Sequence, residues 1–137
     1  MRAKEYLKQY KEAMRLVAVL QQEYDEEMDL IDNIRSSLGG DGMPRSGEIS
    51  KKVENQAIKL AEKSEGLYEA KLEALRLQNK IFKTVMMVPG DAGSVLYERY
   101  IRLHKWETIA DNIGYSIRQT HNLHRQGLEA IEEIINP

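Results

Sequence analysis

The sequence predicts an all-α protein in which a long antiparallel helical hairpin is followed by a three-helix helix-turn-helix domain. Three observations predict this fold class. Apolar residues recur at alternating spacings of three and four along the first two thirds of the chain, one glycine-rich segment interrupts them, and the last third carries the signals of a helix-turn-helix. We expect the hairpin at residues 1–88 and the helix-turn-helix domain at residues 89–137.

The first long helix is expected within residues 2–37, which contain neither glycine nor proline. At ~1.5 Å per residue, such a helix is about 50 Å long. Residues 38–47 (LGGDGMPRSG) hold four glycines and a proline, and we expect them to form a loop. One apolar seam, interrupted by Gln21, runs along the helix at Ala3, Leu7, Tyr10, Met14, Val17, Tyr24, Met28 and Ile31.

The second long helix is expected to start at Glu48 or Ser50 and to end before Pro89 and Gly90. Proline cannot continue a helix, and glycine favours the left-handed conformation that follows a helix end. We assign its apolar seam to Val53, Ala57, Leu60, Ala61, Ser64, Leu67, Tyr68, Leu72, Leu75, Ile81 and Phe82.

Two helices that pack only on each other bury a narrow apolar stripe, so an isolated pair of this length is marginally stable. Further apolar residues lie beside the two seams and widen the apolar faces beyond what one partner helix covers. A second copy of the hairpin would cover them, so we expect a homodimer with a four-helix arrangement. Whether helices are exchanged between the two chains is left open. The residues beside the seams are Leu16, Leu20, Leu30, Ile34, Ile58 and Leu77.

Residues 106–128 (WETIADNIGYSIRQTHNLHRQGL) predict a short helix, a tight turn and a second helix. Ile109, Ala110 and Ile113 form one apolar face of the short helix. Gly114 follows at the position that favours a left-handed residue, and Ser116 can cap the next helix. We expect that helix over residues 117–135, with an inner face of Thr120, Leu123, Gly127, Leu128 and Ile131. A glycine inside a helix lowers its stability, which indicates a close approach by a neighbouring helix.

The outer face of helix 117–135 carries hydrogen-bonding side chains, and no Asp or Glu lies between residues 114 and 126. We expect this helix to enter the major groove of DNA. Arg118, Gln119 and Asn122 are the predicted base readers, because arginine pairs with guanine and glutamine or asparagine pairs with adenine.

Neighbouring residues are predicted to support this contact. His121 is expected to face the groove, and Arg125 is expected to contact a phosphate. One of His104 and Lys105 is expected to meet a phosphate where the first motif helix begins and backbone N–H groups point outward. Trp106 is either a core aromatic residue or part of the interface, with its indole N–H directed outward. The predicted DNA-binding residues are Lys105, Trp106, Tyr115, Ser116, Arg118, Gln119, His121, Asn122 and Arg125.

The run of a short helix with Ile-Ala, then Ile-Gly-Tyr-Ser, then an Arg- and Gln-rich helix resembles region four of bacterial sigma factors. Together with residues 96–101 (LYERYI) and residues 41–45 (DGMPR) before a long charged helix, it is similar to phage and prophage regulators of the ArpU/RinA type. The resemblance implies sequence-specific binding to double-stranded DNA in the control of late phage genes. It leaves open whether the protein activates or represses transcription and whether it contacts RNA polymerase.

Composition narrows the other possibilities. The chain has 137 residues, no cysteine and a formal net charge of −2, so disulfides and thiol catalysis are excluded and attraction to DNA must come from local charge. The N-terminus lacks the apolar core of a signal peptide, and no apolar run is long enough to span a membrane. We therefore expect a protein of a reducing cytoplasm with no membrane contact, and the resemblance implies that this is the cytoplasm of a bacterial host.

We expect no enzymatic activity, no metal and no cofactor. The acidic run at residues 24–29 (YDEEMD) fits a solvated helix face, and the glycine-rich segment lacks the GKS or GKT ending of a phosphate-binding loop. His104, His121 and His124 lack the further strong ligands that a metal site needs. The alternative interpretation is a non-enzymatic helical adaptor or a DNA-packaging recognition protein, in which the helix-turn-helix is not a transcription module.

Overall fold

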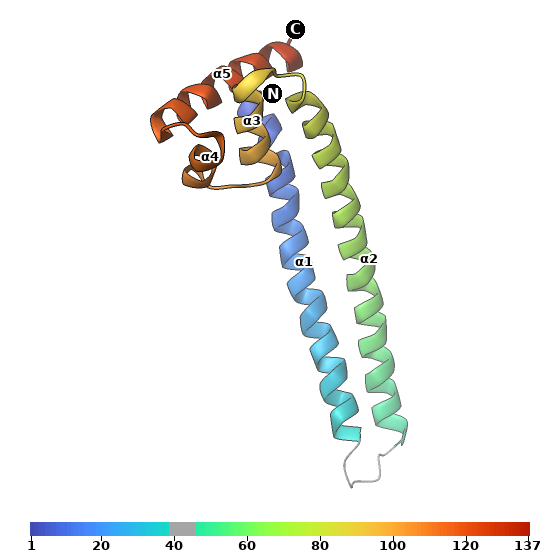
Figure 1. Cartoon of the computed structure of the whole chain (residues 1–137). Coiled ribbons are helices and arrows are strands. Elements are labelled where there is room, and N and C mark those ends of the chain that lie inside the picture. The colour runs from blue at the N-terminus through green and yellow to red at the C-terminus, as the bar shows by residue number, and fades with distance from the viewer. Residues whose placement is uncertain (39–45) are drawn as a thin grey trace. The chain divides into compact units, whose positions relative to one another are not determined.

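The structure is a computed structural model that describes residues 1–38 and 46–137. Every regular element in these residues is helical, and the order of a long antiparallel hairpin followed by short packed helices confirms the predicted fold class (Figure 1). The predicted loop at residues 38–47 lies mostly outside the described residues. The elements are α1 (Ala3–Leu38), α2 (Ser46–Val85), α3 (Gly90–Leu96), the π-helical turn η1 (Tyr97–Ile101), α4 (Trp106–Ile113) and α5 (Ile117–Ile135).

Packing groups the chain into two compact units. One unit is Arg15–Leu72, and the other combines Met1–Met14 with Glu73–Pro137. The predicted division between residues 88 and 89 follows the order of the sequence. Packing instead joins the first turns of α1 and the last turns of α2 to the helix-turn-helix segment.

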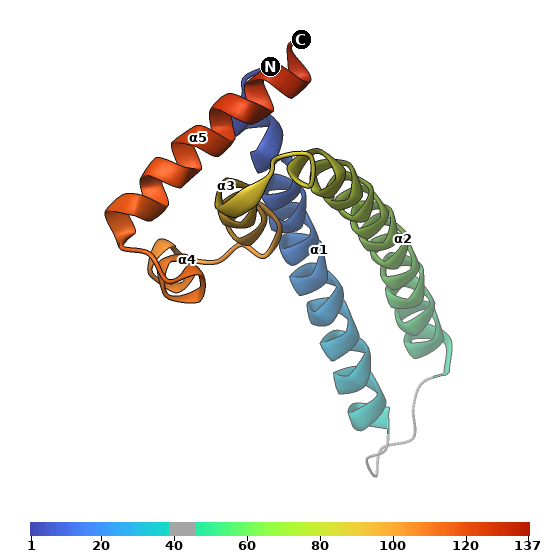
Figure 2. The ribbon, with the colours of Figure 1, turned by 45° about the horizontal axis from the view of Figure 1, so that its top comes forward.

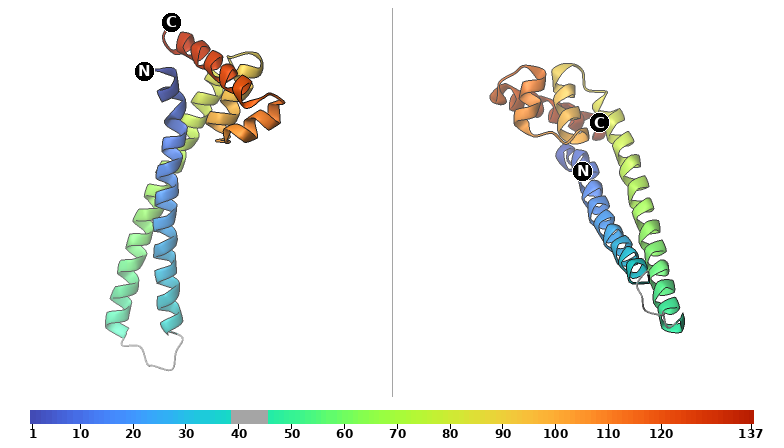
Figure 3. Two further views of the ribbon diagram at one scale, coloured as in Figure 1. Left: turned by 90° about the vertical axis from the view of Figure 1, so that its left-hand side faces the viewer. Right: turned by 60° about the horizontal axis from the view of Figure 1, so that its bottom comes forward.

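In the unit Arg15–Leu72, α1 and α2 run in opposite directions (Figure 3). Val17 from α1 and Leu67 from α2 are buried in it. Glu27 is only 9% exposed, and its Oε1 lies 3.1 Å from Nζ of Lys63 on the other helix. This ion pair links the two helices. An apolar hollow in the same unit is lined by Met28, Ile31, Asp32, Ile34, Arg35, Val53, Ala57 and Leu60.

The seam predicted for α2 combines residues from two faces of the helix. The buried apolar residues of α2 are Leu67, Ala70, Ala74, Ile81 and Val85. Four residues predicted for the same seam are instead between 41% and 64% exposed, namely Tyr68, Leu72, Leu75 and Phe82. At ~100° per residue, the two sets are centred roughly 120° apart around α2. The prediction was wrong for these four residues because periodicity identifies an apolar face but not the helix that covers it.

The unit that contains the helix-turn-helix has a hydrophobic core to which the first turns of α1, the last turns of α2, α3, η1 and α5 contribute residues. Figure 2 shows how these helices are arranged. Leu7 from α1, Ile81 and Val85 from α2, Leu96 from α3 and Ile131 from α5 are each 0% exposed. The ends of the two long helices are therefore part of the core on which α5 rests. Deleting them would uncover the inner face of α5.

None of the helices within the described ranges is both long enough and apolar enough to cross a membrane. Within the same ranges, no three His, Asp or Glu side chains gather in a way that could hold a metal ion.

Candidate nucleic-acid interface

The turn between α4 and α5 has the form that the sequence predicts. Gly114 ends α4 with φ 75° and ψ 28°, a left-handed conformation in which a side chain would be strained, and its N–H donates to the carbonyl of Ala110. Ser116 then starts α5. Its Oγ accepts a hydrogen bond from the Gln119 N–H at 3.1 Å, and Oε1 of Gln119 accepts one from the Ser116 N–H at 3.2 Å. This reciprocal capping box fixes the residue at which α5 begins.

The inner face of α5 packs closely on its neighbours. Thr120 is fully buried, and its Oγ1 donates to the carbonyl of Ser116 at 2.8 Å. Gly127 marks the predicted close approach, because a Cβ at this position would lie 2.9 Å from both Cγ and Cδ1 of Leu96 in α3. Leu123 and Leu128, also predicted for this face, are half-buried. The packing on α3 thus holds the middle of α5 in place.

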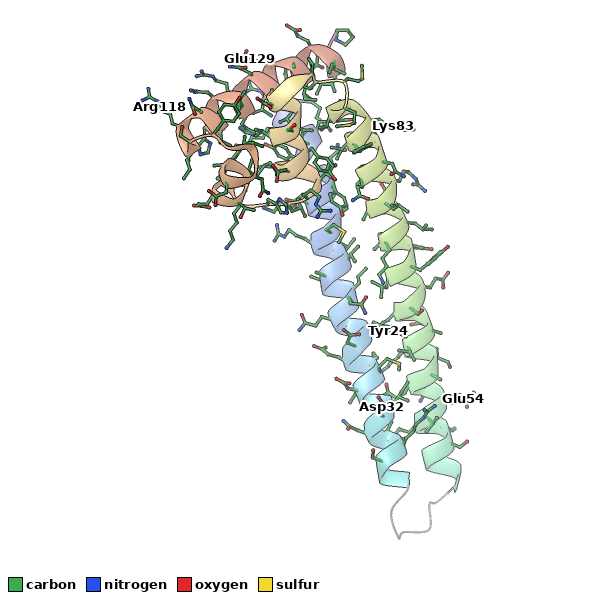
Figure 4. All side chains as sticks on the ribbon, in the orientation of Figure 1. Tyr24, Asp32, Glu54, Lys83, Arg118 and Glu129 are labelled. Carbon is green, nitrogen blue, oxygen red and sulfur yellow. The ribbon has the colours of Figure 1, made fainter. Side chains whose placement is uncertain are left out.

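The outer face of α5 is exposed, as predicted. Arg118, Asn122 and Arg125 are exposed, and Arg118 extends outward from the first turn of α5 (Figure 4). Arg118 and Asn122 are four residues apart and therefore share one side of the helix. No carboxylate lies between residues 114 and 126 to compete with DNA for these donors. Contact of this surface with DNA stays a prediction.

Gln119 is exposed, but its side chain is already used. Its Oε1 accepts the hydrogen bond from the Ser116 N–H. Reading adenine requires both the acceptor and the donor of a side-chain amide. Gln119 can therefore act as a base reader only if it gives up its half of the capping box.

Tyr115 and Ser116 stabilise the turn. The Tyr115 hydroxyl donates a hydrogen bond to Oδ2 of Asp91 at 2.6 Å, which ties the turn to α3. This hydrogen bond and the negative charge of Asp91 raise the pKa of Tyr115. The Ser116 hydroxyl is occupied in the capping box. Both residues have a structural role in shaping the motif, and a role in DNA contact stays a prediction.

Trp106 lies in an aromatic cluster that connects α4, η1 and α5. Its ring centroid is 4.4 Å from that of His121 and 4.8 Å from that of His124, the second in an edge-on arrangement. The Arg99 guanidinium lies 4.5 Å from the centroid of the Trp106 ring. Trp106 is half-buried, so it packs against α5 while part of its ring stays accessible. His121, predicted to face the groove, packs its ring on Trp106 and is otherwise exposed.

His124 is a buried residue of α5. Its Nε2 and the Tyr100 hydroxyl are hydrogen-bonded at 2.7 Å, and the two rings are stacked with centroids 5.7 Å apart. Burial, together with the positive charges of Lys4, His121 and Arg99, lowers the pKa of His124 from 6.5 to about 4. Burial also raises the pKa of Tyr100 to about 12, although the charge of Arg99 opposes this shift. The pair is therefore neutral at neutral pH.

The segment before α4 distinguishes between His104 and Lys105. His104 Nδ1 lies 3.2 Å from Oε1 of Glu98, and the same oxygen accepts a hydrogen bond from Asn112 Nδ2 at 2.6 Å. The His104 carbonyl accepts a further hydrogen bond from Arg99 at 3.1 Å. His104 is thus held within the fold. Lys105 is exposed at the N-cap of α4, which makes it the better placed of the two for a phosphate.

Two cations that were not predicted from the sequence, Arg2 and Lys4, lie beside Arg125. Glu132 Oε2 accepts a hydrogen bond from the Ala3 N–H at 2.6 Å and so holds the start of α1 against α5. Arg2 and Lys4 come from the opposite end of the chain, and only the basic start MRAK signals them. The shared surface hollow is lined by Arg2, Ala3, Lys4, Arg125, Leu128, Glu129 and Glu132.

Comparison of the chain with models of protein families, with curated proteins and with solved structures returned no match. Function is therefore inferred from the residues of α4, the turn and α5.

Proposed function

We propose that this protein is a sequence-specific DNA-binding transcriptional regulator of phage or prophage type, which reads the major groove of double-stranded DNA with α5. The observation that carries the proposal is the exposed, acid-free outer face of α5, which begins at a capping box directly after a tight turn. An α-helix fits the major groove, and in helix-turn-helix proteins the first turns of the second helix contact the base edges.

Arg118 and Asn122 are the proposed base readers. They lie on one side of the first turns of α5, and both are exposed. Arginine presents two donors to guanine, and asparagine presents a donor and an acceptor to adenine. Gln119 has a supporting role in this proposal, because its amide oxygen caps α5.

Phosphate contacts are proposed for cations on both sides of these readers. Lys105 is exposed at the start of α4, where backbone N–H groups also favour an anion. Arg125 lies further along α5, and Arg2 and Lys4 line the same hollow as Arg125. Such contacts position a protein on the duplex without reading its sequence.

Trp106, His124 and Tyr100 are proposed to orient α5 rather than to bind DNA. Their ring contacts and the hydrogen bond between Tyr100 and His124 join α4 and η1 to the middle of α5. A change at these positions should weaken binding to every duplex, because it moves the whole helix.

The regulator is proposed to act as a homodimer, since a single small module has limited contact area with DNA and two linked modules gain effective concentration at a second half-site. Transcription is the process that the resemblance to sigma region four implies. RNA polymerase is proposed as a partner only on the basis of that resemblance.

The test is selection of bound duplexes from a random library, followed by affinity measurements on the enriched site. Arg118→Ala should weaken binding to that site by about 10- to 100-fold, equivalent to ~1–3 kcal/mol. Glu133→Ala is the matched control, because Glu133 is also exposed on α5 but lies near its C-terminal end. If no site is enriched and the full-length chain binds no duplex at low salt, the helical-adaptor alternative is favoured instead.

A further inference from the structure

α2 carries a second apolar face, which we call the outer stripe. Positions 58, 61, 65, 68, 72, 75, 79, 82 and 86 follow one another at alternating spacings of three and four. Six of these positions hold large apolar side chains, and each is at least 41% exposed. These six residues are Ile58, Tyr68, Leu72, Leu75, Phe82 and Met86.

The outer stripe lies on a different side of α2 from its buried residues, because the two sets are centred roughly 130° apart at ~100° per residue. A repeat of 3.5 residues is the pattern that a helix shows toward a coiled-coil partner. The apolar row is interrupted at Glu65 and Asn79, but several large exposed apolar side chains on one helix face mark an interaction surface more often than a solvated one. The partner must therefore be a helix with the same spacing.

We propose that the outer stripe is the homodimer interface and that α2 pairs with α2 of a second copy in antiparallel orientation. In the proposed register Leu72 lies opposite Leu75 of the second copy, Tyr68 opposite Asn79, Glu65 opposite Phe82, and Ala61 opposite Met86. The two-fold axis passes between Glu73 and Ala74. This inference deepens the homodimer of the proposed function and rests on it, but its tests need no DNA.

Charges beside the stripe identify a second copy as the occupant. Every second position of the stripe is followed directly by a charged residue. These residues are negative in the first half of the row and positive in the second half, namely Glu62, Glu69, Arg76 and Lys83. In the antiparallel register Glu62 faces Lys83 of the second copy, and Glu69 faces Arg76. Since each pair occurs twice by symmetry, one α2 is complementary to another.

The same charges favour this register over the other simple pairings. Shifting the antiparallel register by one heptad in either direction leaves two attractive pairs instead of four and brings Glu69 opposite Glu69, or Arg76 opposite Arg76. In a parallel pairing, the charged row of one copy lies beside a different row of the second copy, which holds Ser64, Lys71 and Gln78. Lys71 then lies beside Arg76, which is repulsive, and no attractive pair forms. Arg76 also contacts Glu73 at 2.7 Å, but both side chains are more than half exposed and can rearrange at an interface.

An antiparallel pair directs the two α2 C-termini away from each other. The two Met86 positions would be about 40 Å apart along the axis, at ~1.5 Å per residue. The last turns of α2 belong to the same compact unit as α5, so each end of the pair carries one helix-turn-helix. The two-fold axis predicts that the DNA site is an inverted repeat.

Distances between spin labels test the orientation. The chain contains no cysteine, so Lys59→Cys and Lys80→Cys each introduce one label per copy at an exposed position outside the stripe. The antiparallel register predicts about 45 Å between labels at position 59 and about 25 Å at position 80. A parallel pair predicts about 10 Å between the backbones at both positions. Equal short distances, or a chain that sediments as a monomer at micromolar concentration, would overturn the proposal.

Charge exchange tests the register and the identity of the partner. Glu69→Arg and Arg76→Glu should each weaken the dimer roughly tenfold, and the double variant should restore it because the two residues face each other across the two-fold axis. Lys59→Glu is the control, since Lys59 is an exposed cation of α2 outside this row. Leu72→Glu should abolish the dimer while the helix content of the chain stays unchanged. A double variant as weak as the single ones would contradict the pairing, whatever the DNA affinity of the chain.

Discussion

For two glycines that lie inside helices, replacement by alanine should have opposite effects, stabilising the protein at one of them and destabilising it at the other. Gly66 lies inside α2, and a Cβ there meets nothing within 4 Å. Gly127 lies inside α5, and a Cβ there would lie 2.9 Å from the Leu96 side chain. The two substitutions therefore share the same intrinsic gain in helix propensity and differ only in what surrounds them.

The magnitudes follow from these surroundings. Alanine is favoured over glycine in a helix by up to about 1 kcal/mol. At Gly66 this gain is unopposed, so Gly66→Ala should stabilise the unit Arg15–Leu72 by roughly 0.5–1 kcal/mol. At Gly127 the added methyl overpacks a core in which Leu96 is 0% exposed. Overpacking of this kind costs about 1–3 kcal/mol, so Gly127→Ala should destabilise its unit by a net ~1 kcal/mol.

Urea unfolding of the full-length chain, followed by circular dichroism, measures both effects. The midpoint should rise for Gly66→Ala and fall for Gly127→Ala. Because Leu96 supports the middle of α5, Gly127→Ala should also weaken DNA binding without changing base preference. If Gly127→Ala raises the midpoint as much as Gly66→Ala, the close contact between α3 and α5 does not exist and the proposed position of α5 loses its support.

Three further predictions concern the site. The pKa of His124 is lowered from 6.5 to about 4 in the folded chain, so the unfolded chain takes up the proton first as the pH drops. Stability should therefore fall between pH 6.5 and pH 4. His124→Gln should flatten the dependence of the urea midpoint on pH in this range. Ser116→Ala removes the cap of α5 and should destabilise it by about 1 kcal/mol, and an unchanged midpoint would argue against the capping box. Lys4→Gln should lower the slope of log affinity against log salt by about 1 if Lys4 contacts a phosphate beside Arg125, whereas an unchanged slope would place it off the DNA.

The local features of the motif were predictable because their signals are local. The left-handed residue at Gly114 and the cap at Ser116 depend on the chemistry of neighbouring residues, and both are confirmed. The close approach at Gly127 was also predicted and is confirmed, because a glycine inside a helix needs a steric reason. The neighbour itself, Leu96, is distant in sequence and gave no signal.

Features that depend on distant residues were not predictable. Periodicity showed that α2 is apolar but not that Leu67 faces α1 while Tyr68 and Leu72 remain exposed. The core under α5 includes Leu7, from the opposite end of the chain. His124 is buried because Tyr100 offers a hydrogen-bond partner, and this pairing depends on the path of η1.

The central claim is that Arg118 reads a base pair, and the most direct measurement is its coupling to that base pair. The affinity of the full-length chain and of Arg118→Ala is measured for the selected duplex and for duplexes with one base pair changed at each position. The full-length chain should lose about 1–3 kcal/mol at each position that it reads. Arg118→Ala should lose discrimination at a single guanine position and keep it elsewhere. If Arg118→Ala weakens binding to all duplexes equally and keeps discrimination at every position, α5 does not read bases through Arg118 and the account is contradicted.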